Sequence, residues 1–148
     1  HLLGPLQSNK VKKVFGLFDY IHSLDRNSLA EKISDEAQKK GCCPKLFIQV
    51  NTGLEEQKAG IEPEKLNDFV KSIRKSLDLN IVGLMCIPPI NDAAETHFKL
   101  LKKLADENGL LELSMGMSSD YIEAIKCGAT YVRVGTAIFG LRHQVQKR

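Results

Sequence analysis

Residues 110–140 read LLELSMGMSSDYIEAIKCGATYVRVGTAIFG, and this stretch decides the fold. It holds two short apolar runs, Leu110–Met115 and Thr130–Val134, and each run opens into a loop of small and hydroxylated residues. We expect both runs to be strands and Ser118 to start the helix between them. Glycine-flanked loops and helix starts present unpaired backbone N–H groups, which bind anions together with the positive end of the helix dipole. The stretch therefore predicts a nest for a phosphate group.

The rest of the chain repeats this alternation of short apolar runs and amphipathic stretches, which indicates βαβ units and a parallel sheet. The expected strands cover 1–4, 19–24, 45–51, 80–86, 110–115 and 130–134, and the expected helices cover 7–14, 27–40, 63–77, 92–108 and 118–127. No GxGxxG motif follows an early strand, which disfavours a Rossmann sheet. In a (β/α)8 barrel, the loops after the last two strands form the usual phosphate site. We therefore predict an α/β fold of the TIM-barrel type, with about six of the eight βα units in this chain.

The composition indicates one globular domain and disfavours several classes of function. The 148 residues are 43% hydrophobic, and 21 basic against 18 acidic residues give a net charge of +3. This balance predicts binding neither to nucleic acid nor to a membrane, and no window approaches the roughly 20 apolar residues that span a bilayer. Cys42, Cys43, Cys86 and Cys127 form no CxxC motif, and no signal-peptide pattern opens the chain. We expect reduced thiols, no metal site and a cytoplasmic location.

Six motifs connect the chain with a known family. They are HLLGPLQSNK, IHSLDR, IQVNTGLEEQKAG, GLMCIPP, LSMGMSSDYIEAI and VRVGTAIFG, and they occur in this order. By these motifs the chain is identified as a member of the pyridoxal phosphate homeostasis protein family, whose single domain resembles the barrel of alanine racemase (fold type III). The similarity runs from His1 to about Arg142. It implies that residues 1–148 form one partial alanine racemase-like barrel domain and that the cofactor is pyridoxal 5′-phosphate (PLP).

The chain departs from the family pattern at its beginning. Family members start with two further βα units, and the first of those strands carries the lysine that forms a Schiff base with PLP. This chain begins where the third strand of the family would end, so we expect the Schiff-base lysine to be absent. Lys10 and Lys126 do not inherit its role, because they lie at a helix opening and a helix end and because lysine is usually solvated.

The resemblance assigns the phosphate group of PLP to Ser118, Gly135 and Thr136. The Ser118 hydroxyl should donate a hydrogen bond to the phosphate, and the N–H groups of Gly135 and Thr136 should complete the cradle. Taken by itself, Ser118 is equally well explained as a plain helix N-cap. The GTAIFG motif at 135–140 favours the ligand role.

Arg133 is a charge inside the apolar run at 130–134. Buried arginine is rare unless it is paired or bound to a ligand, so the two readings are a salt bridge at the outer end of the strand and a ligand contact. The resemblance places this position opposite the pyridine nitrogen of PLP. A guanidinium can only donate hydrogen bonds, so the ring nitrogen stays unprotonated and the ring is a weak electron sink. Such a site holds PLP and is a poor catalyst of carbanion chemistry.

Other polar residues are weaker candidates. His22 and Asp25 could form an acid–base pair, although a core histidine and a helix cap are favoured. Asn51 and Met85 are expected to line the pocket, since both close inner strands at the ligand-facing end. The charged residues of loop 55–58 are expected to be solvated.

Three functions follow from these observations. The leading hypothesis is a non-catalytic carrier and regulator of PLP in vitamin B6 homeostasis. The alternatives are a PLP-dependent amino-acid racemase or decarboxylase of fold type III, which would need a second domain, and a truncated remnant that binds nothing. We expect a monomer, as in the family, or a dimer formed through unpaired sheet edges if the barrel is truncated.

Overall fold

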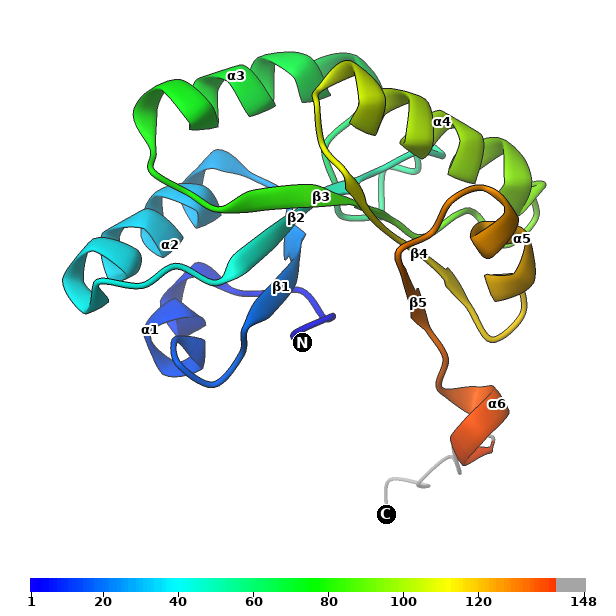
Figure 1. Cartoon of the computed structure of the whole chain (residues 1–148), viewed down its shortest axis with the longest axis horizontal. Helices are drawn as coiled ribbons and strands as arrows, with labels where there is room; N and C mark the ends of the chain where they lie inside the picture. The colour runs from blue at the N-terminus through cyan, green and yellow to red at the C-terminus, as the bar shows by residue number, and fades with distance from the viewer. Residues whose placement is uncertain (141–148) are drawn as a thin grey trace.

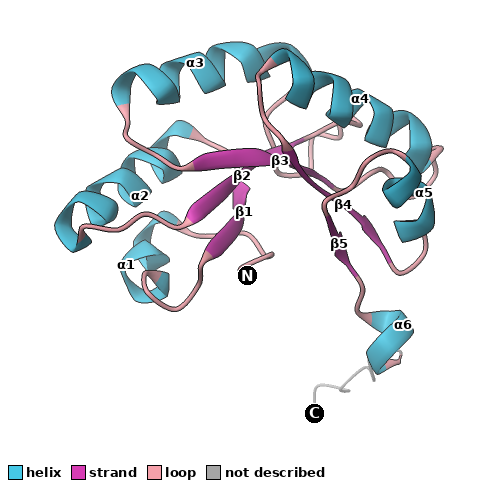
Figure 2. Ribbon diagram, viewed as in Figure 1, coloured by secondary structure: helices cyan, strands magenta, loops and turns pink. Residues whose placement is uncertain are grey.

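The computed structural model of the chain describes residues 1–140 as a curled parallel sheet with helices on its outside (Figure 1). The strands are β1 Tyr20–Leu24, β2 Lys45–Val50, β3 Ile81–Cys86, β4 Glu112–Met117 and β5 Tyr131–Arg133. They pair in chain order, and every pair is parallel. Figure 2 shows the sheet bending so that β1 and β5 lie at its two ends. The predicted α/β class and the partial barrel are confirmed.

The described residues form six α-helices. They are α1 Val11–Val14, α2 Asn27–Lys40, α3 Leu66–Ser76, α4 Ala94–Glu107, α5 Tyr121–Lys126 and α6 Thr136–Phe139, with 3-10 turns at Ser8–Lys10 and Pro63–Lys65. Gly41 ends α2 in the left-handed conformation, which glycine adopts without a Cβ clash. Pro63 opens the turn before α3, where its missing N–H costs nothing. Within residues 1–140, no helix is long and apolar enough to cross a bilayer.

The main core lies between the convex face of the sheet and the helices that cover it. Successive residues of a strand point to opposite faces of the sheet. The apolar side chains on the convex face pack against the apolar faces of the helices. The strand side of this core is Ile21, Leu46, Ile48, Leu84, Leu113 and Met115, and the helix side includes Leu29, Ile33, Leu66, Val70, Phe98, Leu101 and Ala124. Burying each large aliphatic side chain stabilises the fold by about 1.5–3 kcal/mol. This layer holds the strands in the curvature of a barrel.

The concave face carries a second, aromatic layer. His22 of β1 stacks on Phe47 of β2, with ring centroids 4.3 Å apart. Tyr131 of β5 meets Phe47 edge-on at 5.4 Å, and its hydroxyl donates to the Tyr20 hydroxyl at 3.3 Å. Side chains from the two end strands therefore meet across the concave face.

The structure corrects the predicted strand count from six to five in the described residues. Instead of a strand at 1–4, Leu2 forms an isolated parallel bridge with Ile21, in which the Leu2 N–H binds the Tyr20 carbonyl and the Leu2 carbonyl accepts from His22 N–H. Pairing stops there because Gly4 bends the chain and Pro5 has no N–H to donate.

Several helix predictions are also wrong in detail. The helices expected at 7–14 and 63–77 each open with a 3-10 turn, and the helix expected at 92–108 is Ala94–Glu107. The helix expected at 118–127 begins at Tyr121, because Asp120 is its N-cap residue and the Asp120 side chain binds the Met117 N–H. Residues 136–139, expected as loop, form the short helix α6. The helix at 27–40 has the predicted bounds.

We predict that Gly83→Ala destabilises the chain by about 1–3 kcal/mol or more, as overpacking in a core does. A Cβ at this position would lie 2.0 Å from the Glu112 carbonyl oxygen, so β3 and β4 would have to separate. Urea unfolding followed by circular dichroism measures the change. Gly4→Ala is the control, since nothing lies within 4 Å of a Cβ there. Equal unfolding free energies for the two variants would show that the strand contact is not as close as described.

Candidate functional site

A cavity of about 450 Å³ runs along β5 on the concave side of the sheet. It is lined by His1, Leu3, His22, Tyr131, Val132, Arg133, Val134 and Gly135. Two of the four predicted site residues, Arg133 and Gly135, therefore line the same cavity. A parallel βα fold binds ligands at the carboxyl ends of its strands, and β5 ends at this cavity.

Arg133 reaches across two neighbouring strands. Its Nη1 donates to the Ser114 hydroxyl of β4 at 2.7 Å, and its Nη2 donates to the Cys86 carbonyl of β3 at 2.8 Å. Both acceptors are neutral, whereas the hypothesis that Arg133 forms a salt bridge required a carboxylate partner. The residue is mostly buried, and this burial lowers the pKa of the guanidinium. Since a guanidinium has five N–H donors, three remain for other partners.

Ser114 connects Arg133 to His22. Its side chain is fully buried, and its hydroxyl oxygen lies 2.8 Å from His22 Nδ1. Because Arg133 donates to this hydroxyl, we assign the hydroxyl hydrogen to His22 Nδ1, which leaves Nε2 as the protonated nitrogen of the ring. His22 Nε2 then donates to His1 Nδ1 at 3.0 Å. Burial, followed by the charge of Arg133, lowers the pKa of His22 to about 4, so the imidazole is neutral at pH 7.

Ser114 is not among the site residues predicted from the sequence. A signal was present, because the side-chain period of two places the third residue of the β4 run ELSMGM on one face of the sheet and Leu113 and Met115 on the other. A lone hydroxyl on the face opposite the apolar residues marks a polar interior. The hypothesis of a His22–Asp25 pair is not supported, since Asp25 forms an ion pair with Arg26 at 2.5 Å. His22 is the core histidine that the alternative reading favoured.

Ser118 lies against the start of α6 rather than at the start of α5. Its hydroxyl oxygen accepts hydrogen bonds from the N–H groups of Gly135 at 3.3 Å and Ala137 at 3.2 Å. The structure thus brings Ser118 and Gly135 together, as predicted, while the second amide at the hydroxyl belongs to Ala137 and not to Thr136. The N-cap reading of Ser118 is wrong, because Asp120 occupies that position. Two backbone donors converge on one oxygen, which is the arrangement of an anion nest.

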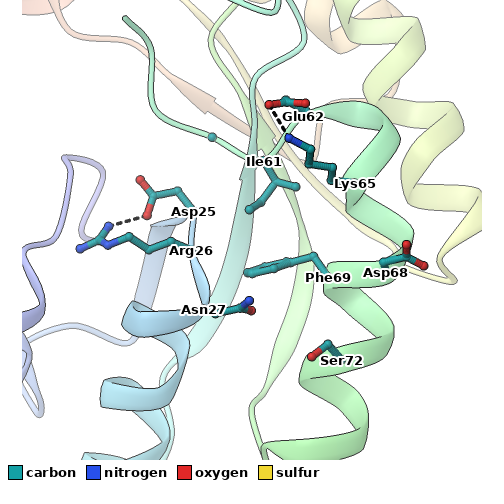
Figure 3. A pocket seen from close by; sticks show the side chains of 10 residues that line it. Asp25, Arg26, Asn27, Ile61, Glu62, Lys65, Asp68, Phe69 and Ser72 are labelled. Atoms are coloured by element: carbon teal, nitrogen blue, oxygen red, sulfur yellow. Dashed lines mark hydrogen bonds and ion pairs between the residues drawn. The ribbon is translucent and has the colours of Figure 1, made fainter. Parts of the chain in front are cut away.

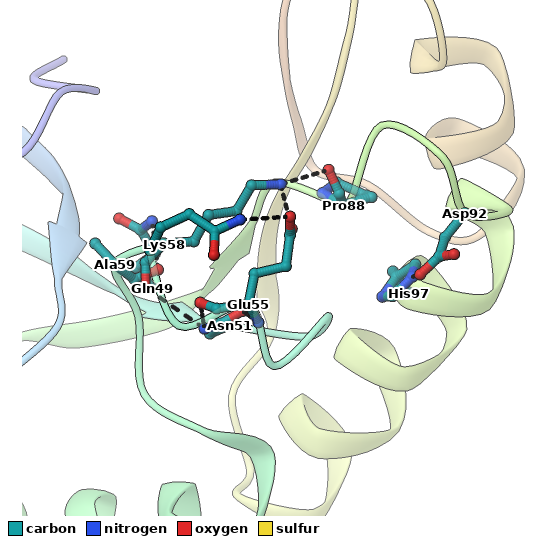
Figure 4. Close-up of polar contacts among 9 residues, drawn as sticks. Gln49, Asn51, Glu55, Lys58, Ala59, Pro88, Asp92 and His97 are labelled. Atoms are coloured by element: carbon teal, nitrogen blue, oxygen red, sulfur yellow. Dashed lines mark hydrogen bonds and ion pairs between the residues drawn. The ribbon is translucent and has the colours of Figure 1, made fainter.

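The loop after β2 is held by its own polar contacts (Figure 4). The Asn51 side-chain amide donates to the Glu55 carbonyl at 2.9 Å, and its oxygen accepts from the Glu55 N–H. Lys58 pairs with the Glu55 carboxylate at 2.5 Å and donates to the Pro88 carbonyl at 3.4 Å. Glu55 and Lys58 are therefore partly buried rather than simply solvated, and Asn51 fixes the loop. Met85, a residue of β3, is buried with 1% of its surface exposed.

A larger cavity of about 530 Å³ lies between α2 and α3 (Figure 3). Both cations that line it are paired with carboxylates, since Arg26 pairs with Asp25 and Lys65 pairs with Glu62 at 2.8 Å. None of the residues that line it lines the cavity at β5. The cavity at β5 is the better candidate, because among the described residues Arg133 is a cation without a carboxylate partner, whereas both cations of the larger cavity have one.

A family model described as "Alanine racemase, N-terminal domain" matches residues 1–143 of the chain. A pyridoxal phosphate homeostasis protein from Aquifex aeolicus is 42% identical over 151 residues, which cover 96% of this chain and 66% of that protein. The protein of the same name from Haemophilus influenzae is 39% identical over 153 residues, which cover 97% of this chain and 65% of that protein. The chain therefore spans just under two thirds of the length of these relatives.

Solved structures of related proteins also match the chain. PipY of Synechococcus elongatus, solved without PLP, superposes with a TM-score of 0.87 at 41% identity over 95% of this chain and 70% of PipY. PipY with PLP bound gives a TM-score of 0.81 at 38% identity over 95% of this chain and 69% of PipY. An alanine racemase of Clostridium difficile, at 16% identity and a TM-score of 0.68 over 95% of this chain and 39% of that enzyme, is similar in fold alone. Arg142, where the sequence resemblance ends, lies outside the described residues.

We predict that the stability of the chain falls by about 3 kcal/mol as the pH drops from about 6.5 to about 4, through His22. The unfolded chain binds a proton at this histidine near pH 6.5, whereas the folded chain keeps it neutral down to about 4. The loss is therefore complete below that pH. Urea unfolding of the chain and of His22→Gln across this range isolates the effect, because every other titrating group is shared. Parallel curves for the two proteins would contradict the buried, neutral histidine.

Proposed function

This chain belongs to the alanine racemase N-terminal domain family, and from that membership we propose that it binds PLP and serves PLP homeostasis as a non-catalytic carrier and regulator. The observation that carries the proposal is Arg133, a mostly buried guanidinium with neutral protein partners and three N–H donors left over beside a cavity. A charge in such a position calls for an acceptor from outside the chain. The PLP-bound structure of PipY supports the identity of the ligand.

The phosphate group would lie at the end of β5. The Ser118 hydroxyl oxygen accepts from Gly135 N–H and Ala137 N–H, so an acceptor already occupies the position where a phosphate oxygen would sit. The N–H groups of Gly135 and Ala137 would donate to the phosphate, and the Ser118 hydroxyl would donate its own hydrogen. Thr136 follows Gly135 at the start of α6, and we propose that its N–H would also contribute to the cradle.

Arg133 would bind the pyridine nitrogen of the ligand. A guanidinium only donates, so it selects the unprotonated nitrogen. When bound, PLP supplies an electron-withdrawing ring, and an unprotonated nitrogen makes that ring a weak electron sink. This chemistry supports a carrier over an enzyme of carbanion reactions.

The names of the relatives support the same choice, since they describe homeostasis of pyridoxal phosphate. We propose that the protein acts in the cytoplasm as a partial barrel domain that is monomeric or pairs through the edge of β5, with neither nucleic acid nor a membrane as a partner. A racemase or decarboxylase of the same fold is the alternative. Racemisation of alanine above background by the chain with PLP would favour that alternative and contradict the carrier.

We predict that the chain binds pyridoxine 5′-phosphate and that Arg133→Gln weakens this binding about tenfold to a hundredfold. This ligand keeps the ring nitrogen and the phosphate and has no aldehyde, so it cannot react with surface lysines. A hydrogen bond from a charged group contributes about 1.5–3 kcal/mol, which corresponds to that range. Equilibrium dialysis or calorimetric titration measures the affinity.

The control is Arg74→Gln, which removes an exposed arginine of α3. It should bind like the unaltered chain, and thermal unfolding should report whether Arg133→Gln remains folded. Equal affinity of the unaltered chain and Arg133→Gln would remove Arg133 from the site. Absence of binding by the unaltered chain would favour the non-binding remnant.

A further inference from the structure

We propose that Ser114 is a positioning residue that, with the Cys86 carbonyl, aims the Arg133 guanidinium and so sets the preference of the site for a ligand ring with an acceptor nitrogen. This inference rests on the proposed function, because it concerns how the same site chooses its ligand. It assigns to Ser114 a role that acts through Arg133 and requires no contact between Ser114 and the ligand.

The geometry shows a guanidinium held at two points. Arg133 starts on β5, touches Ser114 on β4 at 2.7 Å and ends at the Cys86 carbonyl on β3 at 2.8 Å. The Cys86 carbonyl is part of the backbone at the end of β3, so its position is fixed by the sheet. Ser114 supplies the second point. Two bonds to a planar group fix its plane, whereas one bond leaves it free to rotate.

The hydroxyl of Ser114 is itself fixed in direction. Its oxygen has to accept from Arg133, since a guanidinium has no acceptor, and its hydrogen then points to His22 Nδ1 at 2.8 Å. His22 is 1% exposed and stacks on Phe47, so packing restrains the ring that receives this hydrogen. Each member of the chain of hydrogen bonds therefore determines the orientation of the next. This series of hydrogen bonds ends at the three N–H groups of Arg133 that remain for a ligand.

The alternative is that Ser114 only stabilises the fold. A buried hydroxyl with two hydrogen bonds contributes to stability, and its loss would loosen the site for every ligand alike. A positioning role makes a different claim. Loss of the hydroxyl should affect a ligand with a ring nitrogen more than a ligand of the same shape without one.

Two ligands separate these readings. Pyridoxine 5′-phosphate presents the ring nitrogen, and its 1-deaza analogue carries C–H at the same place with the phosphate and the other substituents unchanged. The unaltered chain should prefer the first by about tenfold to a hundredfold, which is the range of a hydrogen bond from a charged donor. In Ser114→Ala that preference should fall at least about threefold, while affinity for the deaza analogue stays close to that of the unaltered chain.

The control is Ser23→Ala. Ser23 is also a buried strand serine, 1% exposed, and its hydroxyl has no hydrogen-bond partner in residues 1–140. This variant should keep the full preference for the ring nitrogen. If Ser114→Ala does not fold, Ser114→Cys is the second variant, because it is close in volume and its sulfur is a weak acceptor.

Each outcome decides between the readings. A reduced preference in the Ser114 variants supports positioning. An equal loss of affinity for both ligands, or an unchanged preference, overturns it and leaves PLP binding in place. Failure of the unaltered chain to bind either ligand overturns the proposed function and this inference with it.

Discussion

The Arg133 guanidinium is a permanent charge on the inside of a curled sheet, and the polar groups around it are arranged to suit it. A mostly buried charge needs acceptors, and the sheet offers the Ser114 hydroxyl and the Cys86 carbonyl. His22 beside it is neutral at pH 7, because its burial and, second, the charge of Arg133 lower its pKa to about 4. The direction of every hydrogen bond from Arg133 to His22 follows from the fact that arginine has no acceptor.

The proposed phosphate end of the site depends on a close approach of α5 to β4. Gly116 in β4 has a φ of +94°, and a Cβ there would lie 2.5 Å from the Ala124 Cβ of α5. The absence of a side chain lets α5 pack directly on β4, and the turn between them then directs Ser118 toward the start of α6. Asp120 closes the turn by binding the Met117 N–H. Ser118 therefore does not cap α5, and its hydroxyl can accept from the amides of Gly135 and Ala137.

Periodicity predicted the elements whose apolar stripe is long. The helix at 27–40 has the bounds that the sequence indicates, because a single buried face accounts for it. The strand expected at 45–51 begins at the predicted residue and ends one residue earlier, at Val50. Short elements escaped prediction for local reasons. Asp120 took the N-cap position that Ser118 could equally have filled, and α6 has four residues, too few for a pattern. Of the site, Arg133 was visible as a charge in an apolar run. Ser114 was not singled out, because its role depends on a contact with a residue 19 positions away.

Within residues 1–140, side chains of the two end strands meet although β1 and β5 do not pair. Tyr20 and Tyr131 come from the two end strands, yet their hydroxyls are 3.3 Å apart, and Phe47 and His22 fill the space beneath them. Side-chain packing inside a barrel is what normally accompanies backbone closure. Here the interior layer joins β1 to β5 directly, while the helices hold the convex face. The cavity at β5 and the guanidinium beside it therefore rest on packing that five strands already provide.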